Sequence, residues 1–112
     1  MIDKNLVWPP LAVPVEQSQP QTSDIDATLQ ERGSRYGKFT GHAAVAQTLK
    51  LVMATALVER GRSLSADQRE ALDMIAHKIG RIINGDPNYA DSWVDIAGYA
   101  KLVADRLNGV ER

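Results

Sequence analysis

The sequence contains no cysteine, which excludes disulfide bonds, thiolate zinc sites and cysteine nucleophiles. It has little net charge: 13 basic and 14 acidic residues leave a formal charge of −1, so no overall field attracts a nucleic acid backbone. No uninterrupted apolar run approaches the roughly 20 residues of a membrane span. The N-terminus lacks the basic start and apolar stretch of a signal peptide. We therefore expect a soluble, cytoplasmic protein for which membrane and nucleic acid binding are not expected.

A chain of 112 residues fits one domain. Four of the five prolines lie between Pro9 and Pro20, and proline disfavours helix there. We therefore expect residues 1–22 to form a Pro-rich extended arm and residues 23–112 to form a single α-helical domain. The arm is either a disordered tail or a segment that packs on the domain or on a neighbouring subunit. Its apolar side chains, which favour the second alternative, are Leu6, Val7, Trp8, Leu11, Val13 and Val15.

Apolar periodicity and capping signals predict four helices and an all-α fold, a small helical bundle. The expected helices cover about residues 24–32, 41–60, 66–84 and 89 or 91 to 107. Gly33 would stop the first helix and Thr40 would cap the second. The third begins with the capping-box pattern Ser65–Gln68 and ends at Gly85. The expected core stripe of the fourth helix consists of Trp93, Ile96, Ala100, Val103 and Leu107.

The second expected helix is apolar on two opposite sides. One stripe consists of Val45, Leu49, Val52, Met53 and Ala56, and the opposite side carries Ala44, Leu51 and Val58. A chain of this size cannot cover both sides by itself. The pattern predicts a homo-oligomer, most simply a two-fold dimer.

The third and fourth helices are joined by a short turn and should run antiparallel. That hairpin would bring Glu70 and Asp73 towards Asp95, with Asp91 as a weaker fourth acid. Carboxylates that lie close together repel one another unless a cation neutralises them, and oxygen ligands suit Mg²⁺. Such an ion can bridge phosphate oxygens and activate water. The alternative is a solvated helix face, with Asp73 and His77 as a surface pair.

The segment Gly33–Thr40 contains two glycines, two cations and two aromatic residues, which is typical of a structured loop. Tyr36 and Phe39 would anchor this loop, leaving Arg35 and Lys38 to meet an anion. An ordinary turn with surface cations remains the alternative.

Residues 70–87 and 91–100, together with the loop Arg35–Phe39, resemble a group of small proteins encoded by phages and prophages; the resemblance covers about residues 30–107. More distantly, the layout is similar to the MazG-like, all-α nucleoside triphosphate pyrophosphohydrolases. In those enzymes an acid-x-x-acid pair on one helix and a Glu-x-x-Asp pair on the next hold Mg²⁺. Glu70 and Asp73 match the first pair and Asp95 matches the last acid, whereas Ser92 stands where the remaining Glu belongs.

The resemblance implies a Mg²⁺-dependent, nucleotide-binding phage protein, in which a (deoxy)nucleoside triphosphate is cleaved to its monophosphate and pyrophosphate. Glu70, Asp73 and Asp95 would be catalytic and hold the metal, with Asp91 as a further ligand. Substrate would contact Arg35, Tyr36, Lys38, His77 and Lys78. Two alternatives stay open: a non-catalytic protein that sequesters a nucleotide signal of host defence, and a protein–protein inhibitor. A phage protein of any of these kinds would act in the host cytoplasm.

Overall fold

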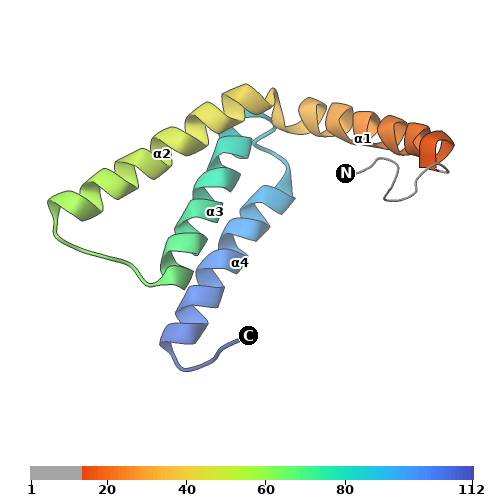
Figure 1. The fold of residues 1–112 in the computed structure, drawn as a ribbon. Helices are drawn as coiled ribbons and strands as arrows, with labels where there is room; N and C mark the ends of the chain where they lie inside the picture. The colour runs from red at the N-terminus through yellow and green to blue at the C-terminus, as the bar shows by residue number, and fades with distance from the viewer. Residues whose placement is uncertain (1–13) are drawn as a thin grey trace, which may run out of the picture. The chain divides into compact units, whose positions relative to one another are not determined.

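The structure is a computed structural model that describes residues 14–112, with side chains from residue 24 onwards. The described residues form the helices α1 (Pro14–Tyr36), α2 (Phe39–Glu59), α3 (Ala66–Asn84) and α4 (Ala90–Leu107), drawn in Figure 1, and contain no strand. The expected all-α class is confirmed. The chain divides into two units, residues 1–32 and residues 33–112, and the second unit holds α2, α3, α4 and the last turn of α1.

Helix α1 is longer than the sequence predicted. It begins at Pro14, where a missing amide donor costs little because first-turn amides have no helical partner. Residues 14–22, expected in the extended arm, are therefore helical, and residues 1–13 of that arm lie outside the described residues. Gly33 does not stop the helix. The stop is Gly37, whose φ of +78° is the left-handed conformation that glycine adopts most readily.

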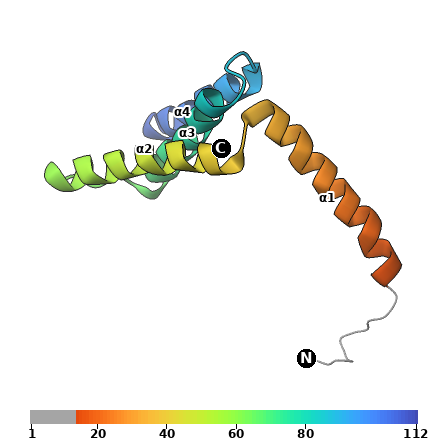
Figure 2. The same ribbon diagram turned by 90° about the horizontal axis from the view of Figure 1, so that it is seen from above.

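Helix α3 is the centre of the second unit. It packs against α2 on one side and α4 on the other, while α2 and α4 make no contact with each other (Figures 1 and 2). The three helices therefore form one layer, in which α3 is shared.

Small residues let α2 approach α3 closely. A Cβ atom at Gly80 of α3 would lie 2.6 Å from Cδ2 of His42 and 3.1 Å from the His42 carbonyl oxygen. Ala46 of α2 and Ala76 of α3 are buried in the same contact region of their helices. His42 is itself buried, and its Nε2 lies 3.0 Å from the carbonyl oxygen of His77.

Polar contacts confirm that α3 and α4 form an antiparallel hairpin. Arg106 lies near the end of α4 and Asp67 near the start of α3. The Arg106 guanidinium donates to both carboxylate oxygens of Asp67, at 2.8 and 2.7 Å. Those two hydrogen bonds hold the pKa of Asp67 well below its usual value. The capping box is present, because the Ser65 N–H donates to Oε1 of Gln68 at 3.0 Å.

Several side chains expected in the core are exposed, which corrects the sequence interpretation. Trp93 is 54% exposed and Leu107 is 60% exposed, whereas the buried hydrophobic residues of the described part are three alanines and Ile82. Periodicity identifies an apolar stripe but not what covers it. A single layer of helices leaves each of its two faces open.

Among the described residues, α2 is the helix whose length and composition would allow it to cross a membrane. Polar residues interrupt its apolar sequence, which an average over the whole helix tolerates. One of these is Lys50, and a lysine at a bilayer centre costs about 2.5–3.5 kcal/mol. The fold is compatible with a soluble protein.

The contact between Gly80 and His42 predicts an unusual effect of alanine. Gly80→Ala adds a methyl group where the neighbouring ring and carbonyl leave no room, so strain of about 1–3 kcal/mol should exceed the helix-propensity gain of about 1 kcal/mol. We expect a lower free energy of unfolding by urea titration. The matched control is Gly98→Ala in α4, where nothing lies within 4 Å and stability should rise by about 0.5–1 kcal/mol. Equal stabilisation by both substitutions would contradict this packing.

Candidate functional site

The four acids predicted as metal ligands have separate surroundings. Asp95 pairs with Lys78 across the hairpin, with Oδ2 2.9 Å from Nζ. Asp73 lies 3.8 Å from the Nε of Arg69, one turn earlier on the same helix.

The other two acids are on the surface. Oδ2 of Asp91 accepts a hydrogen bond from the Tyr89 hydroxyl at 2.8 Å, and Glu70 is exposed beside a small hollow between α3 and α4. Ser92, at the position where the MazG-like pattern has a glutamate, is buried and brings no carboxylate. Across residues 24–112, no three His, Cys, Asp or Glu side chains are grouped to hold a metal. These residues, as they are placed, do not fit a Mg²⁺ ion.

Basic side chains gather instead where α2 meets α3. We call Lys50, His42, His77, Lys78 and Arg81 the basic cluster. The two imidazole rings lie edge to face, with centroids 4.4 Å apart and planes at 78°. Lys78 is nearly buried, with 12% of its side chain exposed. Within residues 24–112, neither Lys50 nor Arg81 makes an ion pair.

Burial and the neighbouring positive charges lower the pKa values of the two histidines. Burial is the largest cause that lowers the pKa of His77, to about 4, followed by His42 and the cations Arg81, Lys78 and Lys50. Burial also lowers the pKa of His42, and the same three cations add to the effect. Both rings are neutral at pH 7, so positive charge in the basic cluster comes from the lysines and the arginine.

The predicted loop anchor is only partly as expected. Arg81 stacks on Tyr36, with its guanidinium carbon 4.3 Å from the ring centroid, so Tyr36 is an anchor. Phe39 is 76% exposed at the start of α2, where its ring meets the His42 ring edge to face with centroids 5.9 Å apart. Arg35 does not stand out as an anion ligand, because its guanidinium lies 4.2 Å above the Tyr89 ring and donates to the Tyr89 hydroxyl at 2.9 Å.

Asn84, which the sequence analysis missed, ties the loop to the hairpin turn. Its side-chain amide donates to the carbonyl oxygens of Tyr36 at 2.9 Å and Lys38 at 2.8 Å. The Asp86 N–H donates to the Arg35 carbonyl at 2.8 Å, and a Cβ at Gly85 would collide with the Tyr36 backbone. The two motifs at residues 35–38 and 84–86 are thus one structural unit. The sequence does mark this position, because a polar residue, Asn84, and a glycine, Gly85, follow each other at the end of α3.

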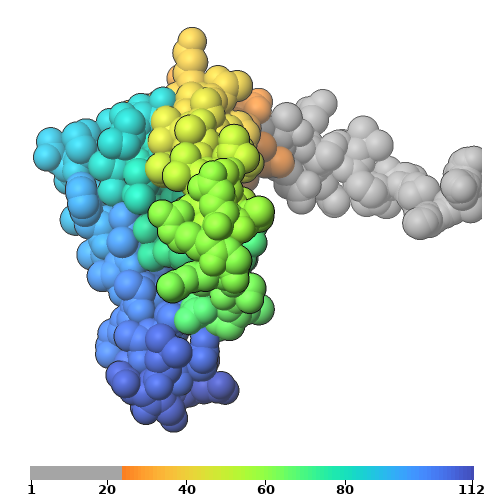
Figure 3. All heavy atoms as spheres, turned by 90° about the vertical axis from the view of Figure 1, so that its left-hand side faces the viewer, coloured from red at the N-terminus to blue at the C-terminus, as the bar shows by residue number. Residues whose placement is uncertain are grey.

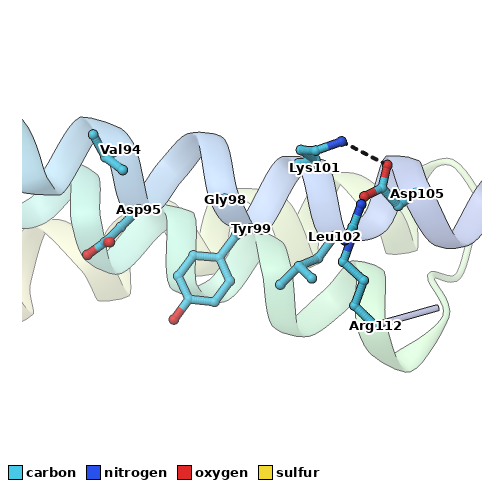
Figure 4. A pocket seen from close by; sticks show the side chains of 8 residues that line it. All are labelled: Val94, Asp95, Gly98, Tyr99, Lys101, Leu102, Asp105 and Arg112. Atoms are coloured by element: carbon cyan, nitrogen blue, oxygen red, sulfur yellow. Dashed lines mark hydrogen bonds and ion pairs between the residues drawn. The ribbon is translucent and has the colours of Figure 1, made fainter. Parts of the chain in front are cut away.

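A hollow of about 570 Å³ runs along α4 beside the basic cluster (Figure 4). Asp95, Tyr99 and Leu102 project from one side of the helix, and Arg112 returns beside Asp105. Hydrogen bonds from Arg112 and Lys101 hold the pKa of Asp105 below its usual value. Because Asp95 lines the hollow and pairs with Lys78, the hollow and the basic cluster meet at that ion pair. Together they offer cations beside a largely apolar recess.

The lowered pKa of His77 predicts that stability falls in mild acid. The unfolded chain takes up the proton near pH 6.5 and the folded protein only near pH 4, so the unfolded state binds more protons between these values. Urea unfolding should show a stability that decreases from about pH 6.5 to pH 4, by at most about 1.4 kcal/mol per pH unit for one histidine. His77→Gln should flatten that slope. The Asp67–Arg106 ion pair changes the free energy of unfolding mainly below pH 4, so its contribution should be unaffected by the His77→Gln substitution. An unchanged slope in His77→Gln would show that His77 is not the responsible group.

Comparison with known proteins identifies a family but no activity. No curated protein and no solved structure shows significant similarity to this chain. One family model, described as a domain of unknown function, DUF6378, matches residues 24–107. The match includes the loop, the basic cluster and nearly all of the hairpin, and it covers more than half of the chain. The protein therefore belongs to the DUF6378 family.

Proposed function

We propose that this protein binds a phosphorylated small molecule, with a nucleotide as the first candidate. The site would be the basic cluster together with the adjoining hollow on α4. The observation that carries the proposal is the basic cluster itself: Lys50 and Arg81 have no carboxylate partner in residues 24–112 and lie beside two neutral histidines.

Phosphate groups suit the cations of this cluster. Arginine offers a planar set of donors and lysine a compact charge, and charge-assisted hydrogen bonds to phosphate are strong. Stacking on Tyr36 limits the rotation of the Arg81 guanidinium, so less side-chain entropy is lost when a ligand binds. Lys78 would contribute after sharing its charge between Asp95 and the phosphate.

The hollow suits the remaining part of such a ligand. Its volume of about 570 Å³ lies within the range of about 300–1,000 Å³ for small-molecule sites. Tyr99 and Leu102 supply apolar surface, and the phenol of Tyr99 could stack on a base. The hollow is open on one side. It therefore suits a flat group such as a nucleobase better than a group that must be surrounded by protein.

Binding without hydrolysis agrees best with the placement of the acids. Metal-dependent pyrophosphohydrolysis needs several carboxylates on one ion, whereas Asp95 is held by Lys78 and Asp73 lies by Arg69. A protein that binds a nucleotide and leaves it intact would sequester it, which is the non-catalytic alternative raised by the sequence.

Isothermal titration calorimetry with nucleoside tri-, di- and monophosphates and inorganic phosphate, each with EDTA or with Mg²⁺, tests this proposal. We expect nucleotide binding in EDTA and recovery of unchanged ligand. Arg81→Gln and Lys50→Gln should each weaken binding about tenfold or more, since a charged hydrogen bond is worth about 1.5–3 kcal/mol. The control Arg62→Gln removes the same charge from the α2–α3 connection and should leave affinity unchanged.

Two results would contradict the proposal. The first is no binding of any nucleotide or phosphate by the folded protein. The second is binding that requires Mg²⁺ and releases pyrophosphate, which would support the hydrolase and a rearrangement of the Lys78–Asp95 pair.

A further inference from the structure

The layer of α2, α3 and α4 has two open faces of opposite character. On α3, two residues along the helix turn the side chain by about 200°. Ile79 and Ile83 therefore point away from His77 and Arg81, which belong to the basic cluster.

Apolar side chains of α2, α3 and α4 that lie on the same side of the layer as Ile79 and Ile83 form what we call the apolar face. On each helix, the residues that contact a neighbouring helix show which side belongs to the apolar face. These residues are His42 on α2, Gly80 and Ala71 on α3, and Asp95 and Arg106 on α4. The members of the apolar face are Val45, Leu49, Val52 and Ala56 of α2, Leu72, Ile75, Ile79 and Ile83 of α3, and Trp93, Ile96, Ala100 and Leu107 of α4.

Much of this face is in contact with solvent in the single chain. Ile83 is 68% exposed and Val52 is 60% exposed, in addition to Trp93 and Leu107. Each such side chain would gain about 1.5–3 kcal/mol if it were fully buried. Glu59 lies on the same side, one heptad after Val52 at the end of α2, and the members of the apolar face are themselves uncharged. An apolar surface of this kind, with its charge at the margin, marks an interaction site.

We propose that the apolar face is the interface of a two-fold homodimer, with a second copy of this chain as its occupant. The size of the face supports this. Helix α3 has 19 residues and is about 28 Å long, and α3 with α4 about 9 Å away presents a width of roughly 18 Å, or about 500 Å². The first part of α2 adds to this area before the helix diverges from α3 towards its end (Figure 1). The total approaches the roughly 800 Å² per partner of a stable interface.

Charge is consistent with self-association. In a two-fold contact each residue meets the same surface of the other chain, so a charged face would repel itself and an uncharged one does not. The opposite face, which carries the basic cluster, would repel a second copy. Dimerisation through the apolar face leaves both copies of the basic cluster open, so this inference does not depend on the proposed function.

A second apolar row, on the outward side of α2, is the competing interface. Figure 3 looks onto α2, drawn from yellow to green. The row consists of Ala44, Thr48, Leu51, Thr55 and Val58. It is one helix wide and so offers a smaller area, and two of its five members carry hydroxyl groups. The apolar face is the larger and drier surface.

Sedimentation velocity of the full chain at tens of micromolar tests the proposal. We expect a dimer for the natural sequence. Ile83→Glu and Val52→Glu, on two different helices of the apolar face, should each give a monomer with an unchanged circular dichroism spectrum at low temperature. The matched control is Val94→Glu, because Val94 is 65% exposed on α4 but lies outside the apolar face. It should remain a dimer.

Several outcomes would overturn the proposal, and the first needs no variant. A natural chain that is monomeric up to about 100 µM has no such interface. Dissociation by Leu51→Glu but not by Ile83→Glu would place the interface on the outward side of α2. A monomer that dimerises only after removal of residues 1–13 would show that this segment covers the face. A monomer that floats with phosphatidylcholine–phosphatidylglycerol vesicles would assign the face to a membrane.

Discussion

The contact between the His42 ring and the bare backbone of Gly80 determines how closely α2 approaches α3. Because no side chain separates the two helices there, Nε2 of His42 reaches the carbonyl of His77, and the two rings meet. The same approach brings Lys50 of α2 near enough to the two histidines to add, with Lys78 and Arg81 of α3, to the lowering of their pKa values by burial. A larger residue at position 80 would separate the helices and disperse this charge.

Helix α3 consequently has a different role on each of its four sides. Gly80 faces α2 and Ala71 faces α4, and both are small because close packing requires it. Arg81 lies on the polar side, where stacking on Tyr36 and the hydrogen bonds of Asn84 connect it to the loop before α2. Ile83 lies on the apolar side and is uncovered in the single chain. One helix thus joins a polar surface suited to an anion with an apolar surface suited to a second copy.

The sequence predicted the helices best where local signals were complete. The bounds of α3 match the prediction at both ends, because a capping box opens it and a glycine closes it. The sequence does not predict α1 over residues 14–22, because Pro14 and Pro20 disfavour a helix there, yet the helix begins at Pro14. Trp93 was expected in the core because periodicity reveals which residues are apolar and does not reveal which surface covers them.

The candidate site was harder to predict because it depends on which charges meet across helices. Asp73 and Asp95 were correctly expected on an antiparallel hairpin, yet Lys78, two turns before the end of α3, reaches Asp95 and removes the repulsion that suggested a cation. Spacings of three and four residues place Arg81 on one side of α3 with Glu70, Asp73 and His77, but its stacking on Tyr36 links residues 45 positions apart. Helical spacing places a residue on a face, whereas its partner depends on packing between elements.

The central claim is that the two open faces of the layer have different partners, water and ligand on one and protein on the other. The fluorescence of Trp93 in a Trp8→Phe chain tests it most directly, since Trp93 lies on the apolar face and is 54% exposed in the single chain. The account predicts blue-shifted emission, shielded from acrylamide, at high protein concentration, and red-shifted, readily quenched emission on dilution, with neither altered by saturating nucleotide. Emission that is equally accessible to acrylamide at every concentration would contradict it.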